Sequence, residues 1–300
     1  MEKRILITGG TGFIGQVLCR ELASRGWSLT VLSRQAPNIV KELCGPAQVI
    51  GDLGQTSGGP GFDAVINLAG EGIADKRWSD KRKQALRDSR IALTHDLISA
   101  MESWATKPGV LVSGSAVGVY GNQGDQLVTE ETSPNIEFTH ELCRDWEQAA
   151  LEAEKLGVRV CLSRTGVVAG PGGGFLQRML LPFKLGLGGK LGSGLQYMPW
   201  VHRDDVVAAL TWMLENEQAR GPYNVVSPAP VTNAEFTKGL ARVLGRPAIL
   251  PAPAFALQLM LGEMARLLLT GQRAVPARLE KEGFRFKYPE LADALQDSVK

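Results

Sequence analysis

The sequence is poor in the residues that build metal centres and disulfide frameworks. Its 300 residues include only three histidines and four cysteines, and no two of the cysteines form a Cys-x-x-Cys pair. Scattered cysteines argue against a zinc site and against a disulfide framework, and they favour buried free thiols in a reducing cytosol. We therefore expect a cytoplasmic protein that holds no metal.

Two further absences exclude classes of partner. The formal net charge is only +2, so the chain lacks the basic balance of proteins that bind nucleic acid or anionic membranes. The most apolar stretch, residues 255–269, is too short to span a bilayer and contains Glu263 and Arg266. Its spacing favours an amphipathic helix, and an apolar pocket wall or a dimer contact stays open. We expect a small-molecule substrate, no nucleic acid, no membrane, and a monomer or homodimer.

Short apolar runs alternate with helical segments through the first two-thirds of the chain. Continuous apolar strands separated by helices are typical of a parallel sheet that is covered on both faces. The pattern predicts an α/β fold, a Rossmann-type doubly wound parallel sheet. Strands are expected at 4–9, 28–34, 47–52, 63–70, 109–115 and 158–168, and helices at 13–26, 79–104 and 137–156.

The pattern changes near residue 165. Two glycine-rich stretches follow, "AGPGGGF" and "KLGLGGKLGSG", and neither has strand periodicity. A strand at 222–226 and a helix at 232–244 come later. We expect a dinucleotide-binding domain over 1–165, which also takes in roughly 200–220, and a smaller C-terminal substrate-binding lobe over 166–300. Ligands of open α/β sheets bind at the carboxyl edge, which this lobe should face.

The stretch "TGGTGFIG" (8–15) joins the first expected strand to the first expected helix. Its Gly9, Gly12 and Gly15 would allow a tight turn, a close approach of pyrophosphate and close packing of helix on strand. The N-terminus of the helix adds free N–H groups and a partial positive charge. The loop therefore predicts a dinucleotide cofactor, with Thr11, Phe13 and Ile14 as further binding residues.

The end of the second strand predicts which dinucleotide is bound. An NAD site usually has a carboxylate here for the ribose 2′-hydroxyl, whereas this chain has Ser33 and Arg34. A guanidinium pairs with a 2′-phosphate, so the sequence favours NADP(H). A solvated Arg34 is the alternative.

Several motifs occur in order along the whole chain. They are the glycine loop, "GDL" (51–53), "NLAG" (67–70), "SGSAVGVYG" (113–121), "SRTGVVAGPGG" (163–173), "PWVHRDDVVAAL" (199–210) and "GQRAVPARLEKEGFRFKYPELADAL" (271–295). Together they resemble the extended short-chain dehydrogenase/reductases. The chain is most similar to an atypical branch, the NAD-dependent epimerase/dehydratase-like proteins of unassigned substrate with their characteristic C-terminal domain.

The resemblance implies further site residues. Asp52 and Leu53 would flank the adenine, and a substrate-orienting serine would follow the fifth strand. We favour Ser115, which precedes a small residue, while Ser113 stays open because the segment is one residue longer than usual. Either serine could instead cap the next turn. Residues expected to line the cofactor after the fourth strand are Leu68, Ala69 and Gly70.

The resemblance also implies a Tyr-x-x-x-Lys pair about twenty residues after "VYG", and the chain lacks it. His140 and Arg144 have the same spacing, so His140 could carry a proton and Arg144 could hold a ribose hydroxyl or a substrate phosphate. The alternative is a structural helix with an exposed His140 and with Arg144 paired to a neighbouring glutamate. Tyr120 is a further candidate for proton donation to the substrate.

The basic segment 76–90 begins just after "NLAG" and could hold an anionic substrate. We expect Arg77 and Trp78 at the substrate, although a solvated helix face would explain most of these charges. The sequence thus predicts an oxidoreductase or epimerase that uses NADP(H). The alternative is a non-catalytic module that senses NADPH.

Overall fold

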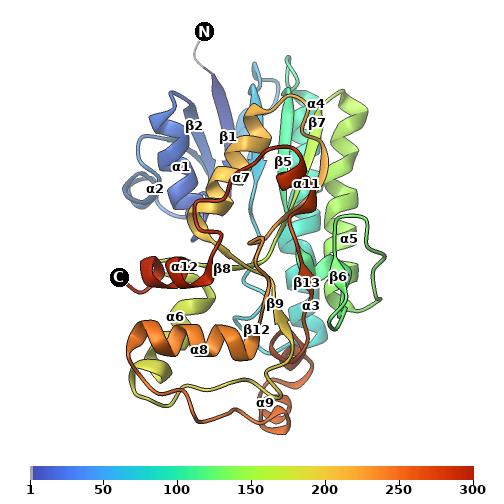
Figure 1. Ribbon diagram of the computed structural model, residues 1–300. Coiled ribbons are helices and arrows are strands. Elements are labelled where there is room, and N and C mark those ends of the chain that lie inside the picture. Colours follow the sequence, from blue (N-terminus) through green and yellow to red (C-terminus); the bar gives the residue numbers. More distant parts are fainter. Residues whose placement is uncertain (1–2) are drawn as a thin grey trace.

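A parallel sheet of seven strands forms the centre of the structure, a computed structural model that describes residues 3–300 (Figure 1). The strand order is β11-β7-β5-β4-β1-β2-β3, and every neighbouring pair is parallel. This is the predicted Rossmann-type doubly wound sheet. Its strands are β1 (Arg4–Thr8), β2 (Ser28–Leu32), β3 (Gln48–Ile50), β4 (Ala64–Asn67), β5 (Val110–Ala116), β7 (Arg159–Thr165) and β11 (Gly221–Val225).

Helices cover both faces of the sheet because successive strand residues point to opposite sides. Ile5 and Ile7 pack in the cluster formed by α1 (Gly15–Ser24), α2 (Pro37–Cys44) and α7 (Arg203–Glu215). Leu6, between them, packs in the cluster that includes α4 (Leu93–Ser103) and the end of α5 (Phe138–Leu151). Figure 1 shows α1 and α5 on opposite sides of the sheet.

The helix expected over 79–104 is interrupted. α3 (Asp80–Arg87) passes through a π-helical turn at Asp88–Ala92 into α4. Within this turn, Arg90 donates from Nη2 to the carbonyl oxygen of Glu71 at 2.8 Å. The turn therefore connects the helix to the loop that follows β4.

The C-terminal lobe contains helices and short two-stranded sheets, and part of its sequence was predicted differently. The glycine-rich stretches suggested loops, but α6 (Gly174–Lys184) begins within the first of them and ends where the second begins. The strand expected in this lobe, β11, belongs to the edge of the main sheet. The other elements are β8 (Val167–Ala169), β9 (Tyr197–Met198), β10 (Trp200–His202), β12 (Val231–Thr232), α8 (Asn233–Leu244), α9 (Ala254–Leu261), α10 (Arg266–Leu269) and α12 (Leu291–Ser298).

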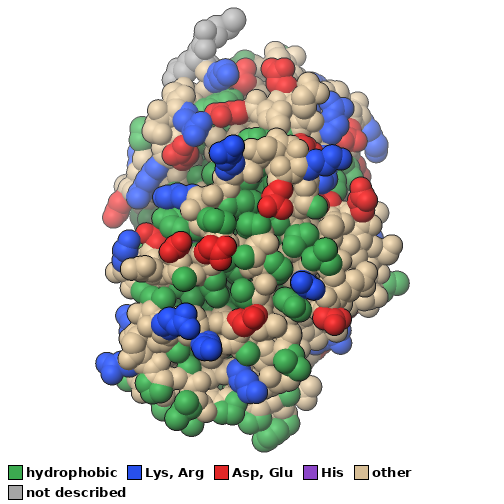
Figure 2. Space-filling model, viewed as in Figure 1, with side chains coloured by type: hydrophobic (Ala, Val, Ile, Leu, Met, Phe, Trp, Pro, Cys, Tyr) green, Lys and Arg blue, Asp and Glu red, His purple; other side chains and the backbone are tan. Residues whose placement is uncertain are grey.

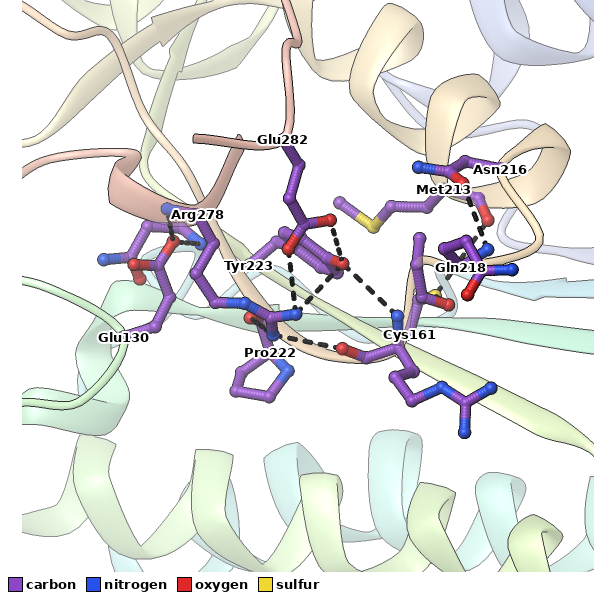
Figure 3. A network of polar contacts seen from close by, with 12 residues as sticks. Glu130, Cys161, Met213, Asn216, Gln218, Pro222, Tyr223, Arg278 and Glu282 are labelled. Atoms are coloured by element: carbon purple, nitrogen blue, oxygen red, sulfur yellow. Dashed lines mark hydrogen bonds and ion pairs between the residues drawn. The ribbon is translucent and has the colours of Figure 1, made fainter. Parts of the chain in front are cut away.

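The last part of the chain returns to the main sheet. β13 (Arg273–Ala274) pairs with β6 (Leu127–Val128), and α11 (Ala277–Lys281) lies beside β11. Figure 3 shows the polar network at this junction. Arg278 donates to the carbonyl oxygen of Pro222 at 2.7 Å and to the hydroxyl of Tyr223 at 3.1 Å, and Tyr223 donates to Glu282 at 2.8 Å. These bonds fasten the C-terminal segment to the edge strand.

A second junction lies at the N-terminus of α7. The buried His202 caps this helix, with Nδ1 accepting from the N–H of Asp204 at 3.2 Å. Asp205 accepts from the N–H groups of Lys287 and Tyr288 at 2.6 and 3.0 Å. The "HRDD" motif therefore anchors the C-terminal segment.

All four cysteines are buried and unpaired. Across residues 3–300, no cluster of three or more His, Cys, Asp or Glu side chains could hold a metal ion. No helix in the same range has the length and apolar character needed to cross a membrane.

Candidate functional site

The glycine loop between β1 and α1 is packed too closely to accept side chains. A Cβ atom at Gly15 would lie 2.2 Å from the carbonyl oxygen of Gly9, and one at Gly9 would lie 2.6 Å from the carbonyl group of Leu68. Gly9 also has a φ of +72°, which favours glycine. The loop thus holds the N-terminus of α1 close to the ends of β1 and β4, an arrangement suited to a pyrophosphate.

A cavity of about 910 Å³ opens at the carboxyl ends of β1, β2, β3 and β4, and we name it the glycine-loop cavity. Ligands of doubly wound sheets bind at this edge. The cavity brings together most of the residues that the sequence predicted for the cofactor. They are Gly9, Thr11, Gly12, Ser33, Arg34, Asp52, Leu53, Leu68, Ala69 and Gly70.

The end of β2 supplies the glycine-loop cavity with a cation. Arg34 is exposed in the cavity wall, and Ser33 beside it accepts from the N–H of Gln35 at 3.1 Å. A nearby acid, Asp52, stands at the end of β3 and not at the end of β2. Its carboxylate accepts a hydrogen bond from the side chain of Gln55 at 3.0 Å. Arg34 is therefore available to an anionic group on a ribose.

Phe13 is not in the wall of the glycine-loop cavity and packs on the glycine-rich stretch "AGPGGGF" (169–175). A Cβ atom at Gly173 would lie 2.5 Å from Cδ2 of Phe13, and one at Gly174 would lie 2.8 Å from Cε1. The guanidinium of Arg203 stacks 4.9 Å from the ring centroid and also donates to the carbonyl oxygen of Pro171 at 2.8 Å. The glycines of "AGPGGG" therefore leave room for this ring. Of the other two loop residues, Ile14 packs against the core and Gly15 packs on Gly9.

A second cavity of about 680 Å³ lies beyond the loop that follows β4, and we name it the apolar cavity. Glu71 lines the glycine-loop cavity and Ile73 lines the apolar cavity, so the two share this loop. The apolar cavity is bounded by the ends of β5 and α5, by β8 and β9, and by residues 263–272. Trp78, which the sequence placed at the substrate, lies in the wall of this cavity. Its ring meets that of Phe138 edge-on at 4.9 Å, and its Nε1 donates to the carbonyl oxygen of Ile73.

On α5, the residues in the wall of the apolar cavity include Thr139 and Cys143 rather than His140 and Arg144. His140 is buried with Nδ1 2.6 Å from the carbonyl oxygen of Val119, so this nitrogen carries the ring proton. Arg144 is 48% exposed and pairs with its neighbour Asp145 at 2.7 Å. The residues of α5 that face the cavity thus come one position earlier in the sequence than the predicted pair, His140 and Arg144.

Cys143 forms an uncharged part of this wall. Burial raises the pKa of its thiol to about 12, which keeps it protonated at neutral pH. Gly118 lies against the same face of α5, where an added Cβ atom would be 3.2 Å from Cβ of Thr139 and 3.8 Å from Sγ of Cys143. The sequence missed this pair, although residues 139, 143, 146 and 150 mark a helical stripe that packs inward.

Ser115 and Tyr120 belong to a buried polar network behind the apolar cavity and do not line it. The hydroxyl of Ser115 donates to Glu147 at 2.6 Å, and Glu147 is in turn held by Arg164. The hydroxyl of Tyr120 donates to the side chain of Asn224 at 2.7 Å, and burial raises its pKa to about 12. Ser113, the alternative serine, is fully buried within β5.

Two arginines of the basic segment 76–90 support the loop after β4. Arg82 donates to the carboxylate of Glu71 and, at 2.6 Å, to the carbonyl oxygen of Gly72. Together with Arg90, it fixes the loop between the two cavities. Arg77, predicted at the substrate, is exposed beside Gly262 and lies outside the wall of the apolar cavity.

Comparison with known proteins adds the family. The model described as "NAD dependent epimerase/dehydratase family" matches residues 5–226. The chain belongs to the NAD dependent epimerase/dehydratase family. A second model, described as a domain of unknown function (DUF1731), matches residues 252–298, so this family member also carries the C-terminal domain that its motifs predicted.

Relatives of this epimerase/dehydratase family member align along nearly its whole length. "Epimerase family protein MT2273" of Mycobacterium tuberculosis is 42% identical over 97% of the chain and 96% of the relative. The crystal structure of human epimerase family protein SDR39U1 with NADPH matches with a TM-score of 0.89 and 35% identity, over 99% of both chains. A nucleoside-diphosphate sugar epimerase from Corynebacterium glutamicum matches with a TM-score of 0.80 and 30% identity, over 100% of this chain and 58% of the other.

Proposed function

We propose that this protein is an NADPH-dependent oxidoreductase or epimerase that acts on a small molecule. The observation that carries the proposal is the pair of cavities that share the loop after β4. One is lined by the glycine loop and Arg34, and the other is mostly apolar. Such an arrangement suits a cofactor in the first cavity with its reactive end directed at a substrate in the second.

The residues of the glycine-loop cavity fit NADPH. Arg34 would pair with the 2′-phosphate through its fixed fork of donors, and Ser33 adds a hydroxyl beside it. The glycine loop and the N-terminus of α1 would hold the pyrophosphate. When bound, NADPH supplies a hydride. The human relative crystallised with NADPH supports this assignment.

Thr139 is our candidate for orienting the substrate oxygen. It lines the apolar cavity on α5, and its hydroxyl donates to Glu137 at 2.7 Å. We favour it over the residues proposed from sequence because neither Ser115, bonded to Glu147, nor His140, bonded to Val119, lines the apolar cavity. Arg144 points to solvent, so we assign it no part in the chemistry.

Two substitutions of Thr139 test this role. Thr139→Val removes the hydroxyl at similar volume and should lower kcat about a hundredfold, as expected for a lost polar contact to the reacting oxygen. Thr139→Ser keeps the hydroxyl and should retain most of the rate. The dissociation constant of NADPH, measured by its fluorescence, should be the same in both variants. Equal turnover by Thr139→Val and the unchanged protein would remove Thr139 from the mechanism.

The second candidate function is an NADPH-binding sensor without turnover. It is favoured by one observation: the α5 residues that line the apolar cavity, Phe138, Thr139 and Cys143, include neither a phenol nor an ammonium group. A panel of carbonyl compounds separates the two functions. Consumption of NADPH with any member of the panel supports the enzyme. Tight NADPH binding without consumption across the panel supports the sensor.

A further inference from the structure

The wall of the apolar cavity suits hydrocarbon. Side chains that contribute to it include Trp78, Phe138, Val168, Phe175, Met198 and Leu268. They come from segments far apart in the chain, yet they converge on one cavity of about 680 Å³. A cavity of this size accommodates a small organic ligand.

The charged side chains in this wall are already paired. Within residues 3–300 they are Glu137, Glu263 and Arg266. Arg266 forms an ion pair with Glu137, and Glu263 accepts from Lys83 at 2.6 Å. A nucleoside diphosphate brings two negative charges, and burying them without a free cation is unfavourable. Among the described residues, this wall therefore offers a diphosphate no cation that is outside an ion pair.

The side-chain amides of the wall are also engaged within the protein. Gln196 donates to the carbonyl oxygens of Leu191 and Leu268 at 2.9 and 2.7 Å. Gln272 donates to the carbonyl oxygen of Gly121 at 2.7 Å. The N–H groups that hold the backbone in this way are not available to the hydroxyls of a sugar, because a new bond from the same N–H would replace an existing one.

A neighbouring cavity of about 360 Å³ extends the apolar surface toward α6 and the segment that precedes α9. It shares Phe175 and Leu268 with the apolar cavity, and its charged residue Arg178 is paired with Asp75. Beyond it, Figure 2 shows hydrophobic side chains on the surface at the lower end of the molecule, where α9 lies. The apolar space is thus longer than one small ring needs.

We propose that this site binds an uncharged carbonyl compound with a long hydrocarbon body, and not a nucleoside-diphosphate sugar. The inference rests on the function proposed above and names its substrate class. The hydrocarbon lies along the shared wall at Phe175 and Leu268, and the carbonyl oxygen lies at Thr139. This preference differs from that named for the Corynebacterium relative, a nucleoside-diphosphate sugar epimerase.

Equilibrium binding to the NADPH-loaded protein tests the substrate class without relying on turnover. The two probes are methyl nonyl ketone and UDP-glucose, titrated by calorimetry. We expect the ketone to bind at micromolar concentration and UDP-glucose to show no binding at millimolar concentration. UDP-glucose binding more tightly than the ketone, or the absence of ketone binding, overturns the inference.

Two matched substitutions locate the bound ketone. Leu268→Glu puts a carboxylate into the shared wall and should weaken ketone binding at least about tenfold. Leu259→Glu makes the same change on α9, where the side chain is 78% exposed, and should leave binding unchanged. Equal ketone affinity in both variants contradicts the location. If Leu268→Glu fails to fold, the comparison of the two probes on the unchanged protein still decides the substrate class.

The outcomes keep this inference apart from the proposed function. If the protein binds NADPH and UDP-glucose but not the ketone, the proposed substrate class is wrong, while the proposed enzymatic function still stands. Ketone binding without NADPH consumption supports the apolar site and counts against the enzyme.

Discussion

Glu147 and Arg164 form a bidentate ion pair inside the protein. Nε and Nη2 of Arg164 each donate to one carboxylate oxygen of Glu147 at 2.8 Å, and the two side chains are only 13% and 9% exposed. Glu147 lies on α5 and Arg164 on β7, so the pair fixes the cavity-lining helix to the sheet. Ser115 adds a third hydrogen bond to the same carboxylate.

Removal of one member of this pair should be strongly destabilising. Glu147→Gln leaves the guanidinium buried without its charge partner, and we expect a loss of about 3–5 kcal/mol in the free energy of unfolding. Arg144→Ala, on the exposed side of the same helix, should change it by less than about 0.5 kcal/mol. Urea unfolding of both variants measures the difference. A loss below about 1 kcal/mol for Glu147→Gln would contradict the role given to the pair.

The glycine loop should not tolerate a single methyl group at Gly15. The added Cβ atom would lie 2.2 Å from the carbonyl oxygen of Gly9, so the loop must shift. We expect Gly15→Ala to lose about 1–3 kcal/mol of stability and to bind NADPH at least about tenfold more weakly. Gly109→Ala is the control, because its Cβ atom would meet only the carbonyl oxygen of Asp63 at 3.7 Å. Unchanged NADPH affinity in Gly15→Ala would show that the loop does not shape the cofactor site.

The sheet and the glycine loop could be predicted because their signals are local. Ile5 and Ile7 pack in the hydrophobic core on one face of the sheet, and Leu6 packs in the core on the other face. Consecutive apolar residues of this kind indicate a strand that is covered on both faces. In the glycine loop, Gly9 and Gly15 likewise stand where the packing leaves no room for a Cβ atom. Such constraints act within a few residues, so the sequence carries them directly.

The substrate side of the site could not be predicted in the same way. The choice between the pairs His140/Arg144 and Thr139/Cys143 depends on the rotation of α5 about its axis, which the bonds at Glu147 set. The apolar cavity combines α5 with residues 196–199 and 263–272, which are brought together only by tertiary packing. Helix α6 was not predicted because the glycines at its start indicated a loop. These glycines instead make room for the ring of Phe13.

Arg34 should decide between the two nicotinamide dinucleotides. It lines the glycine-loop cavity at the end of β2, where a 2′-phosphate would need a cation. We expect tighter binding of NADPH than of NADH, and Arg34→Ala should weaken NADPH binding about ten- to a hundredfold. NADH affinity should stay the same, and it serves as the internal control. Equal affinities for the two dinucleotides in the unchanged protein would refute the assignment.

His202 should make stability fall in mild acid. Burial lowers the pKa of this side chain below its ordinary value of 6.5. The nearby carboxylates of Asp204 and Asp297 raise the pKa, but their effect is smaller than that of burial. The folded protein therefore binds fewer protons than the unfolded chain below about pH 6.5, and the free energy of unfolding declines as the pH falls through that value. The stability contribution is fully present above the unfolded pKa.

Unfolding of His202→Asn in urea at a series of pH values measures this contribution. Asparagine can still cap α7 but does not titrate, so its stability curve should fall less steeply below pH 6.5 than that of the unchanged protein. The slopes should differ by at most about 1.4 kcal/mol per pH unit, the limit for one proton. His95→Asn is the control, because it makes the same change at a side chain that is 48% exposed and lies outside this junction. Parallel curves for His202→Asn and the unchanged protein would mean that His202 keeps its ordinary pKa in the folded state.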